Sequence, residues 1–271
     1  MIRSAVTLNL ISSMSQGPWI YWHDLEESLR KAAELGFDAV ELFTKSGGDL
    51  DANHLQDRLG HYGLQLAAVG TGAGKVLQGL TLTDPDPEIR KKAIDFIAGM
   101  ISFGAPFGAP AIIGSMQGNV LPSGNREETF ALLAEALAIL EKHAASEGVT
   151  LIYEPLNRYE TNLFNTLEAG SQFLEKNSLS NVKLLADLFH MNIEEDNLAQ
   201  SIREFGKYIG HVHFADSNRR PMGFGHTNMV PIAEELKEIG YSGYVSAEAF
   251  PYPDPDTAAK QTIDSFRKFF R

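Results

Sequence analysis

Eight short apolar runs, rich in β-branched and aromatic residues, alternate along the chain with longer segments of helical periodicity. Each run and the segment after it take roughly 25 to 40 residues, which is the rhythm of a parallel sheet with helical connections. The predicted strands are Ser4–Leu10, Ala39–Phe43, Gln65–Val69, Ala111–Gly114, Thr150–Glu154, Lys183–Asp187, Gly210–Phe214 and Tyr244–Glu248. We therefore predict an α/β protein, a (β/α)8 TIM barrel that forms one domain over residues 1–271.

Capping residues support the alternation, because Asp24, Asp86 and Asn125 each stand just before a predicted helix. The alternative, a doubly wound open sheet, usually has a glycine-rich turn after its first strand, and this chain has none there. The segment Gly70-Thr-Gly-Ala-Gly-Lys75 resembles a phosphate-binding loop only superficially, since its spacing is wrong and Val76 follows the lysine. We predict a mobile loop over the barrel mouth there.

Four residues of metal-ligand type occupy the same register, at the carboxyl ends of the fifth to eighth predicted strands. They are Glu154, Asp187, His213 and Glu248, each about one βα unit after the previous one. The carboxyl ends of barrel strands converge on one cavity, so we predict a shared metal site. One His nitrogen and three carboxylates suit Mn2+, with Mg2+ or Co2+ as alternatives. Such an ion would polarise a substrate carbonyl while Glu154 and Glu248 exchange a proton as general acid and base.

Polar residues close behind these strands would surround the same cavity. Glu160, His190 and Arg219 are predicted to contact substrate hydroxyls, and His211, one layer below His213, is predicted to be a core histidine. The aromatic residues Trp19, Tyr21 and Trp22 after the first strand fit either an apolar wall for a sugar or packing on the barrel rim.

Charge and composition narrow the possible partners. A net charge of −12 and the absence of a Lys/Arg-rich run argue against nucleic acid and against an anionic membrane surface. The chain has no cysteine, which excludes thiolate metal sites and a cysteine nucleophile. No secretory leader or long apolar span is recognisable, so we expect a cytoplasmic protein that binds a small neutral molecule.

Three motifs resemble the ketose 3-epimerases, the D-tagatose and D-psicose 3-epimerase group of the xylose-isomerase-like barrels. They are Glu154-Pro-Leu-Asn-Arg-Tyr-Glu160, Asp187-Leu-Phe-His-Met-Asn-Ile-Glu-Glu195 and Gly210-His-Val-His-Phe-Ala-Asp-Ser-Asn-Arg219, the last followed by Pro221-Met-Gly-Phe-Gly225.

The resemblance implies that the four ligands bind the metal and that Glu154 and Glu248 exchange the proton at C3. It also implies that Glu160, His190 and Arg219 contact the substrate around O1 to O3. The chain departs from the group in two places, with Ala215-Asp216 in place of Gly-Glu and only a short segment, Ala249–Asp256, after the eighth strand. We expect a homo-oligomer, either a dimer or a tetramer.

Other activities share this arrangement of residues. An aldose–ketose isomerase of the hydroxypyruvate-isomerase type would use the same metal and return the proton to the adjacent carbon, and an inosose or dehydroshikimate dehydratase would eliminate water. A barrel-shaped apurinic endonuclease would need further histidines after the second to fourth strands, where this chain has none. A non-catalytic sugar-binding barrel would not need acids on opposite sides of a metal. Phosphorylated substrates remain open because Arg158, Arg219 and Arg220 lie near the cavity.

Overall fold

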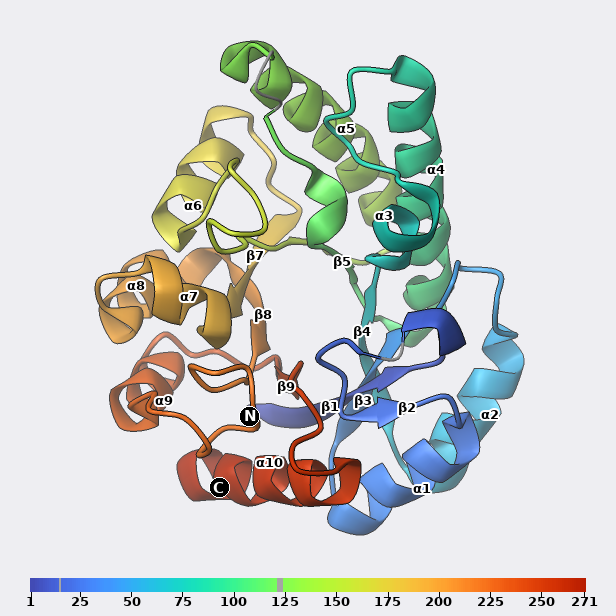
Figure 1. Cartoon of the computed structure of the whole chain (residues 1–271), viewed down its shortest axis with the longest axis vertical. Coiled ribbons are helices and arrows are strands. Elements are labelled where there is room, and N and C mark those ends of the chain that lie inside the picture. Colours follow the sequence, from blue (N-terminus) through green and yellow to red (C-terminus); the bar gives the residue numbers. More distant parts are fainter. Residues whose placement is uncertain (15, 121–123) are drawn as a thin grey trace.

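Eight parallel strands close into a barrel in the computed structural model, which describes residues 1–14, 16–120 and 124–271 (Figure 1). The barrel strands are β1 (Arg3–Asn9), β3 (Ala39–Phe43), β4 (Gln65–Gly70), β5 (Ala111–Ile113), β6 (Leu151–Tyr153), β7 (Val182–Asp187), β8 (Ile209–His213) and β9 (Tyr244–Ala247). They pair in chain order, and β9 pairs with β1 to close the ring. The predicted (β/α)8 barrel is confirmed.

A ninth strand was not predicted. β2 (Tyr21–Trp22) pairs with β1 outside the ring, where Leu8 faces Tyr21. A strand of two residues is too short to show the alternation of apolar and polar side chains by which a strand is predicted. The pairing buries Tyr21 in the core, whereas Trp19 lines the barrel mouth. Packing on the barrel rim is therefore confirmed for Tyr21, whereas a wall for a sugar at Trp19 stays a prediction.

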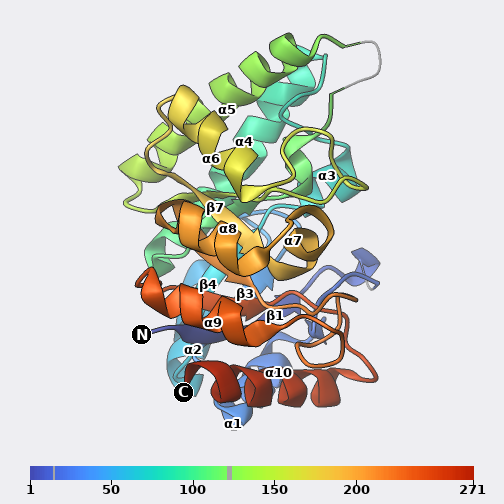
Figure 2. The same cartoon turned by 90° about the vertical axis from the view of Figure 1, so that its left-hand side faces the viewer.

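Helices surround the barrel as an outer ring (Figures 1 and 2). They are α1 (Leu25–Leu35), α2 (Ala52–Tyr62), α3 (Ala73–Gln78), α4 (Pro87–Gly104), α5 (Arg126–Ser146), α6 (Leu167–Lys176), α7 (Leu188–Glu194), α8 (Leu198–Phe205), α9 (Met229–Glu238) and α10 (Pro255–Phe270). Short 3-10 helices lie at η1 (Ser12–Met14), η2 (Ala105–Phe107), η3 (Ser115–Gln117) and η4 (Gly206–Tyr208). The caps Asp24, Asp86 and Asn125 each accept a backbone N–H of the first helical turn. Among the described residues, no helix is long and apolar enough to cross a membrane.

Side chains alternate along each strand between the barrel interior and the helix layer. Tyr153, Val212 and Ala247 belong to the large core between strands and helices. The interior holds a small separate cluster of Ala68, Ile112, Ile152 and Leu185. Ile152 and Leu185 lie two residues before Glu154 and Asp187, so this apolar cluster forms the floor beneath the cavity.

Several boundaries near the cavity differ from the sequence prediction, and β6, β8 and β9 each end one residue earlier than predicted. Glu154 and Glu248 follow strands β6 and β9 by one residue instead of ending them, because the backbone already turns away from the ladder at each of them. Of the loop predicted at Gly70–Lys75, Thr71 and Gly72 connect β4 to α3 at the barrel mouth, but the prediction is wrong from Ala73 on. There α3 begins, and the backbone N–H of Gly79 caps its end. The left-handed φ of +70° at Gly79 allows that cap.

Candidate active site and metal centre

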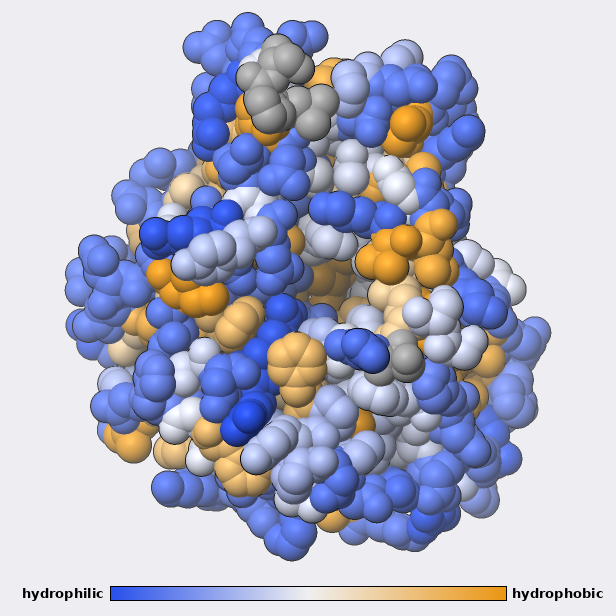
Figure 3. All heavy atoms as spheres, in the orientation of Figure 1, coloured by the Kyte–Doolittle hydropathy of each residue, from blue (hydrophilic) through white to orange (hydrophobic). Residues whose placement is uncertain are grey.

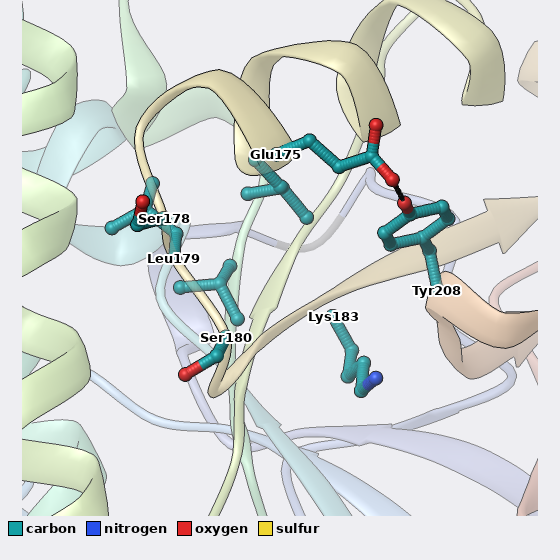
Figure 4. A pocket seen from close by; sticks show the side chains of 8 residues that line it. Glu175, Ser178, Leu179, Ser180, Lys183 and Tyr208 are labelled. Carbon is teal, nitrogen blue, oxygen red and sulfur yellow. Dashed lines mark hydrogen bonds between the residues drawn. The ribbon is translucent and has the colours of Figure 1, made fainter.

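The carboxyl ends of the strands surround a hollow of about 250 Å3 that opens on the face seen in Figures 1 and 3. Glu154, Glu160, His213, Arg219 and Glu248 all line it. A larger hollow of about 460 Å3 lies at the opposite end of β7, beside Glu175, Lys183 and Tyr208 (Figure 4). In that hollow Tyr208 donates a hydrogen bond to Glu175, and none of the predicted site residues lines it.

The four predicted ligands converge. One ligand-type atom from each of Glu154, Asp187, His213 and Glu248 lies within 4.8 Å of the other three. Nδ1 of His213 is 3.1 Å from Asp187 Oδ2, and it is 3.6 Å from both Glu154 Oε1 and Glu248 Oε2. All four residues are buried, with no more than 9% of their surface exposed.

A divalent cation fits this donor set. Nε2 of His213 lies 3.1 Å from Glu41 Oε1, and since a carboxylate accepts, Nε2 carries the hydrogen. That assignment leaves the lone pair of Nδ1 facing three carboxylates, an arrangement that calls for a positive charge between them. Glu154 Oε1 is buried without a hydrogen-bond partner, as expected for an atom reserved for an ion.

Sequence reasoning missed Glu41, which lies on β3, entirely buried, beneath this cluster. Its Oε2 lies 2.7 Å from His211 Nε2, and its Oε1 contacts His213, so one carboxylate orients both histidines. Although burial opposes it, the pKa of Glu41 is held below its ordinary value by the nearby His213 imidazole and the hydrogen bond from His211. The prediction that His211 is a buried, hydrogen-bonded histidine agrees with this arrangement.

The electrostatics of the ligands reflect their mutual proximity. Burial raises the pKa of Glu248, and Arg219 and His213 oppose that rise. Burial acts in the same direction on Asp187, but the neighbouring imidazoles of His190 and His213 together lower its pKa. Burial alone would lower the pKa of His213, whereas Glu41 and Glu248 raise it well above the ordinary value. The cluster therefore concentrates negative charge around one nitrogen.

His190 is placed by the first turn of α7 and by the loop after β6. Its Nδ1 lies 2.7 Å from Asn157 Nδ2 and accepts from the backbone N–H of Asn157 at 3.3 Å. Because both neighbours are donors, Nδ1 is the acceptor and the hydrogen lies on Nε2. That N–H is buried without a partner, 3.7 Å from Glu154 Oε1. It is available to donate to an oxygen atom bound in the cavity.

Arg219 lies between two acids at the cavity wall. Its guanidinium donates to Glu248 Oε2 at 2.5 Å and to Glu160 Oε1 at 3.4 Å, and its plane lies over Phe189. Arg219 has a left-handed φ of +57°. The predicted substrate contacts Glu160, His190 and Arg219 thus meet beside the ligand cluster.

The family model described as "Xylose isomerase-like TIM barrel" matches residues 29–269. The chain belongs to the xylose isomerase-like TIM barrel family. It is 32% identical to D-psicose 3-epimerase of Ruminiclostridium cellulolyticum over 244 residues, which is 86% of this chain and 82% of the relative. It is 39% identical to 3-dehydro-D-guloside 4-epimerase of Escherichia coli over 133 residues, 49% of this chain and 51% of that protein.

Solved structures agree with this assignment. The crystal structure of D-psicose 3-epimerase with D-tagatose from Clostridium cellulolyticum H10 superposes with a TM-score of 0.82 at 26% identity, covering 100% of both chains. Relatives that match most of this chain are named epimerases, so the protein is an enzyme of the isomerase class.

Proposed function

We propose that the protein is a metal-dependent sugar epimerase that inverts C3 of a free ketose. The observation that carries this proposal is the convergence of Glu154 and Glu248 on one buried nitrogen of His213. The two carboxylates come from β6 and β9, on different sides of the ring, so they approach a bound sugar from different directions. The similarity to a D-psicose 3-epimerase over most of the chain supports the same reaction.

Glu154, Asp187, His213 and Glu248 would hold the ion, for which one nitrogen and three carboxylates favour Mn2+, with Mg2+ or Co2+ as alternatives. When bound, the ion supplies a Lewis acid that polarises the carbonyl at C2 and stabilises the negative charge of an enediolate. We therefore expect activity to be lost when the metal is removed and to return when it is added.

The protein's own groups carry the proton. One of the two glutamates removes the C3 proton, the electrons of the C–H bond form a C2–C3 double bond, and the other glutamate returns a proton to the opposite face. The unpaired Nε2–H of His190 would donate to a substrate oxygen, and Arg219 would orient Glu248 and the neighbouring hydroxyl. The wall formed by Trp19 and Phe43, whose ring centroids are 5.4 Å apart, would exclude water from the reacting carbons.

Charges near the cavity favour a substrate without a phosphate group. Arg158 pairs with Glu194, Arg220 lies 3.7 Å above the ring of Tyr252, and Arg219 already contacts two acids. Each arginine therefore has a partner that a phosphate would have to replace. We infer a neutral ketose.

A second candidate is epimerisation at C4 of a sugar that carries its carbonyl at C3. The 39% identity to 3-dehydro-D-guloside 4-epimerase favours it, although that match covers only half of each chain. The chemistry is the same, because the proton removed is again next to a carbonyl and an enediolate again forms. Only the position of the carbonyl relative to Glu154 and Glu248 differs.

Incubation with Mn2+ in D2O distinguishes these reactions. A panel of ketoses, aldoses and 3-keto-glycosides is treated with the purified protein, and the position of deuterium is found by NMR. Label at C3 of a ketose with the inverted product supports the proposal, and label at C4 of a 3-keto-glycoside supports the second candidate. Label only at C1 or C2 would replace epimerase with isomerase, and loss of water would indicate a dehydratase. The absence of exchange on every sugar, with metal present, would contradict a sugar substrate.

A further inference from the structure

Gln117 is a fully buried amide at the end of η3, and every polar atom of its side chain is paired. Its Nε2 donates to the backbone carbonyls of Gly114 at 3.0 Å and of Glu154 at 2.9 Å. Its Oε1 accepts from the hydroxyl of Tyr153 at 2.5 Å. A buried amide with all its hydrogen bonds made has one orientation, since rotation would set its oxygen against the two backbone carbonyl oxygens.

Tyr153 supplies the hydrogen-bond donor for the amide oxygen of Gln117. Its ring is buried in the layer between barrel and helices, pointing away from the cavity. Burial raises the pKa of its hydroxyl, so the group stays a neutral donor. The carbonyls of Gly114 and Glu154 can only accept, so they hold both amide hydrogens, and the amide oxygen accepts from Tyr153.

The hydrogen bond from Gln117 to the carbonyl of Glu154 takes the place of a sheet hydrogen bond. The backbone N–H of Glu154 donates to Ile113 on the neighbouring strand at 3.0 Å, but β6 ends before Glu154 and its carbonyl accepts from Gln117 instead. Glu154 is thus held on both sides of its Cα by the end of β5 and by η3. The position of the Glu154 carboxylate depends on how firmly its backbone is held.

The same segment leaves room for the Glu154 carboxylate. A Cβ atom added to Gly114 would lie 2.5 Å from Glu154 Oε2, closer than nonbonded atoms approach. Only glycine at this position allows that carboxylate oxygen its place beside β5. The remaining oxygen, Oε1, is the one without a partner that faces His213.

The far end of the loop after β6 is attached to the same neighbour. Thr161 Oγ1 donates to the carbonyl of Gly118 at 2.9 Å. The backbone N–H of Asn162 donates to Asn119 Oδ1, and Asn162 Oδ1 accepts from the backbone N–H of Val120. The loop that begins at Glu154 and carries Glu160 is therefore fastened at both ends to the segment that carries Gln117.

We propose that Gln117 is a positioning residue for Glu154, acting through the backbone carbonyl and contacting neither the metal nor the substrate. The inference rests on the proposed function in that Glu154 is taken as a metal ligand and as one of the two acid–base groups. A residue that only fills the core would affect stability alone. A positioning residue also affects how tightly the ligand cluster binds its ion and how fast the proton moves.

The test compares Gln117→Met, which keeps the length and loses the hydrogen bonds, with Tyr153→Phe, which removes the hydroxyl and leaves the bond to Glu154. Both variants lose a buried hydrogen bond and should melt at lower temperature than wild type. Titration of metal-free protein with Mn2+ by calorimetry should show about 10- to 100-fold weaker binding for Gln117→Met, as for other groups that orient metal ligands. Tyr153→Phe should bind Mn2+ within about threefold of wild type. With the sugar that wild type turns over, Gln117→Met should lower kcat more than it raises KM.

Gln117→Glu repeats the test if the Met variant does not fold, because it keeps the shape and places a carboxylate oxygen against the two carbonyls. Wild-type Mn2+ affinity in a folded Gln117 variant would overturn the proposal, and so would an equal loss in Tyr153→Phe. The titration contains no sugar, so it gives its answer even if no sugar is turned over. Failure of the proposed function would instead appear as wild-type protein that binds Mn2+ but exchanges no deuterium.

Discussion

Glu41 Oε1 lies 3.1 Å from Nε2 of His213, on the side of the imidazole opposite Asp187. The carboxylate fixes the tautomer, so that Nδ1 faces the cluster with a free lone pair. The same carboxylate contacts His211 at 2.7 Å, which makes the two histidines and Glu41 one unit beneath the ligands.

Replacing Glu41 by Gln should therefore weaken Mn2+ binding by about 10- to 100-fold, because the amide no longer holds the ring in one tautomer. Calorimetric titration of the metal-free protein measures this directly. The exposed residue Glu128 on α5 provides the control, and Glu128→Gln should bind Mn2+ like wild type. An unchanged affinity in Glu41→Gln would show that His213 does not depend on this bond.

Glu248→Gln tests the pair of acids. The amide cannot accept or return a proton, so kcat should fall by about 10²- to 10⁴-fold, and incorporation of solvent deuterium should fall with it. Glu160→Gln is the matched comparison, because Glu160 is predicted to contact the substrate without exchanging protons. Its KM should rise while kcat changes less. A Glu248→Gln variant with full activity would remove the two-carboxylate mechanism.

The barrel and the ligand set could be predicted from sequence because both follow from repetition. Strand and helix alternate with regular spacing, and the strand ends share one register, so Asp187 and His213 could be placed together without coordinates. The predicted ends of β6, β8 and β9 were each one residue too late, since where a strand ends depends on hydrogen bonds to its neighbours. For Glu154 that neighbour is the side chain of Gln117, which comes from the preceding βα unit.

Glu41 and Gln117 were missed for a related reason. Glu41 has no partner near it in the sequence. Its role depends on His211 and His213 of β8, which are far away in the chain. Alternation along Ala39–Phe43 does place Glu41 on the inward face, and that was the available signal. Gln117 carries no such signal, because it lies in a short 3-10 turn.

Asp216 should make the stability of the protein depend on pH. The residue is 1% exposed, and burial alone would raise its pKa, but backbone N–H donors lower the pKa below its ordinary value. The donors are Ser217 and Thr227 to Oδ1, and Gly223 and Gly225 to Oδ2. A lowered folded-state pKa stabilises the protein above the unfolded value of about 4 and loses that effect as pH falls through the folded value.

Asp216→Asn should lower the free energy of unfolding by about 1.5–3 kcal/mol at pH 7, since its NH2 group would face backbone donors. Denaturant unfolding between pH 7 and pH 3 should show the difference from wild type shrinking below about pH 4. Asp57→Asn, at an exposed position on α2, is the control and should show no such trend. A difference that is independent of pH would mean that the charge of Asp216 does not hold this loop.

Trp19 should contribute to sugar binding as part of the cavity wall. It lines the hollow together with Phe43, and its indole N–H is buried without a hydrogen-bond partner. Loss of an aromatic contact of this kind costs about 0.5–1.5 kcal/mol, so Trp19→Ala should raise KM by about 2- to 10-fold with a smaller effect on kcat. Trp19→Phe should retain part of the contact and lose the N–H.

Trp22 offers the matched control, because its indole N–H donates to the backbone carbonyl of Trp19 at 2.7 Å and its side chain does not line the hollow. The chain has two tryptophans, so Trp22→Phe leaves Trp19 as the sole reporter of fluorescence. Addition of substrate to that variant should change its emission with a midpoint near KM, while its KM stays close to that of wild type. If Trp19→Ala bound sugar as tightly as wild type, the aromatic wall would serve only to pack the rim of the barrel.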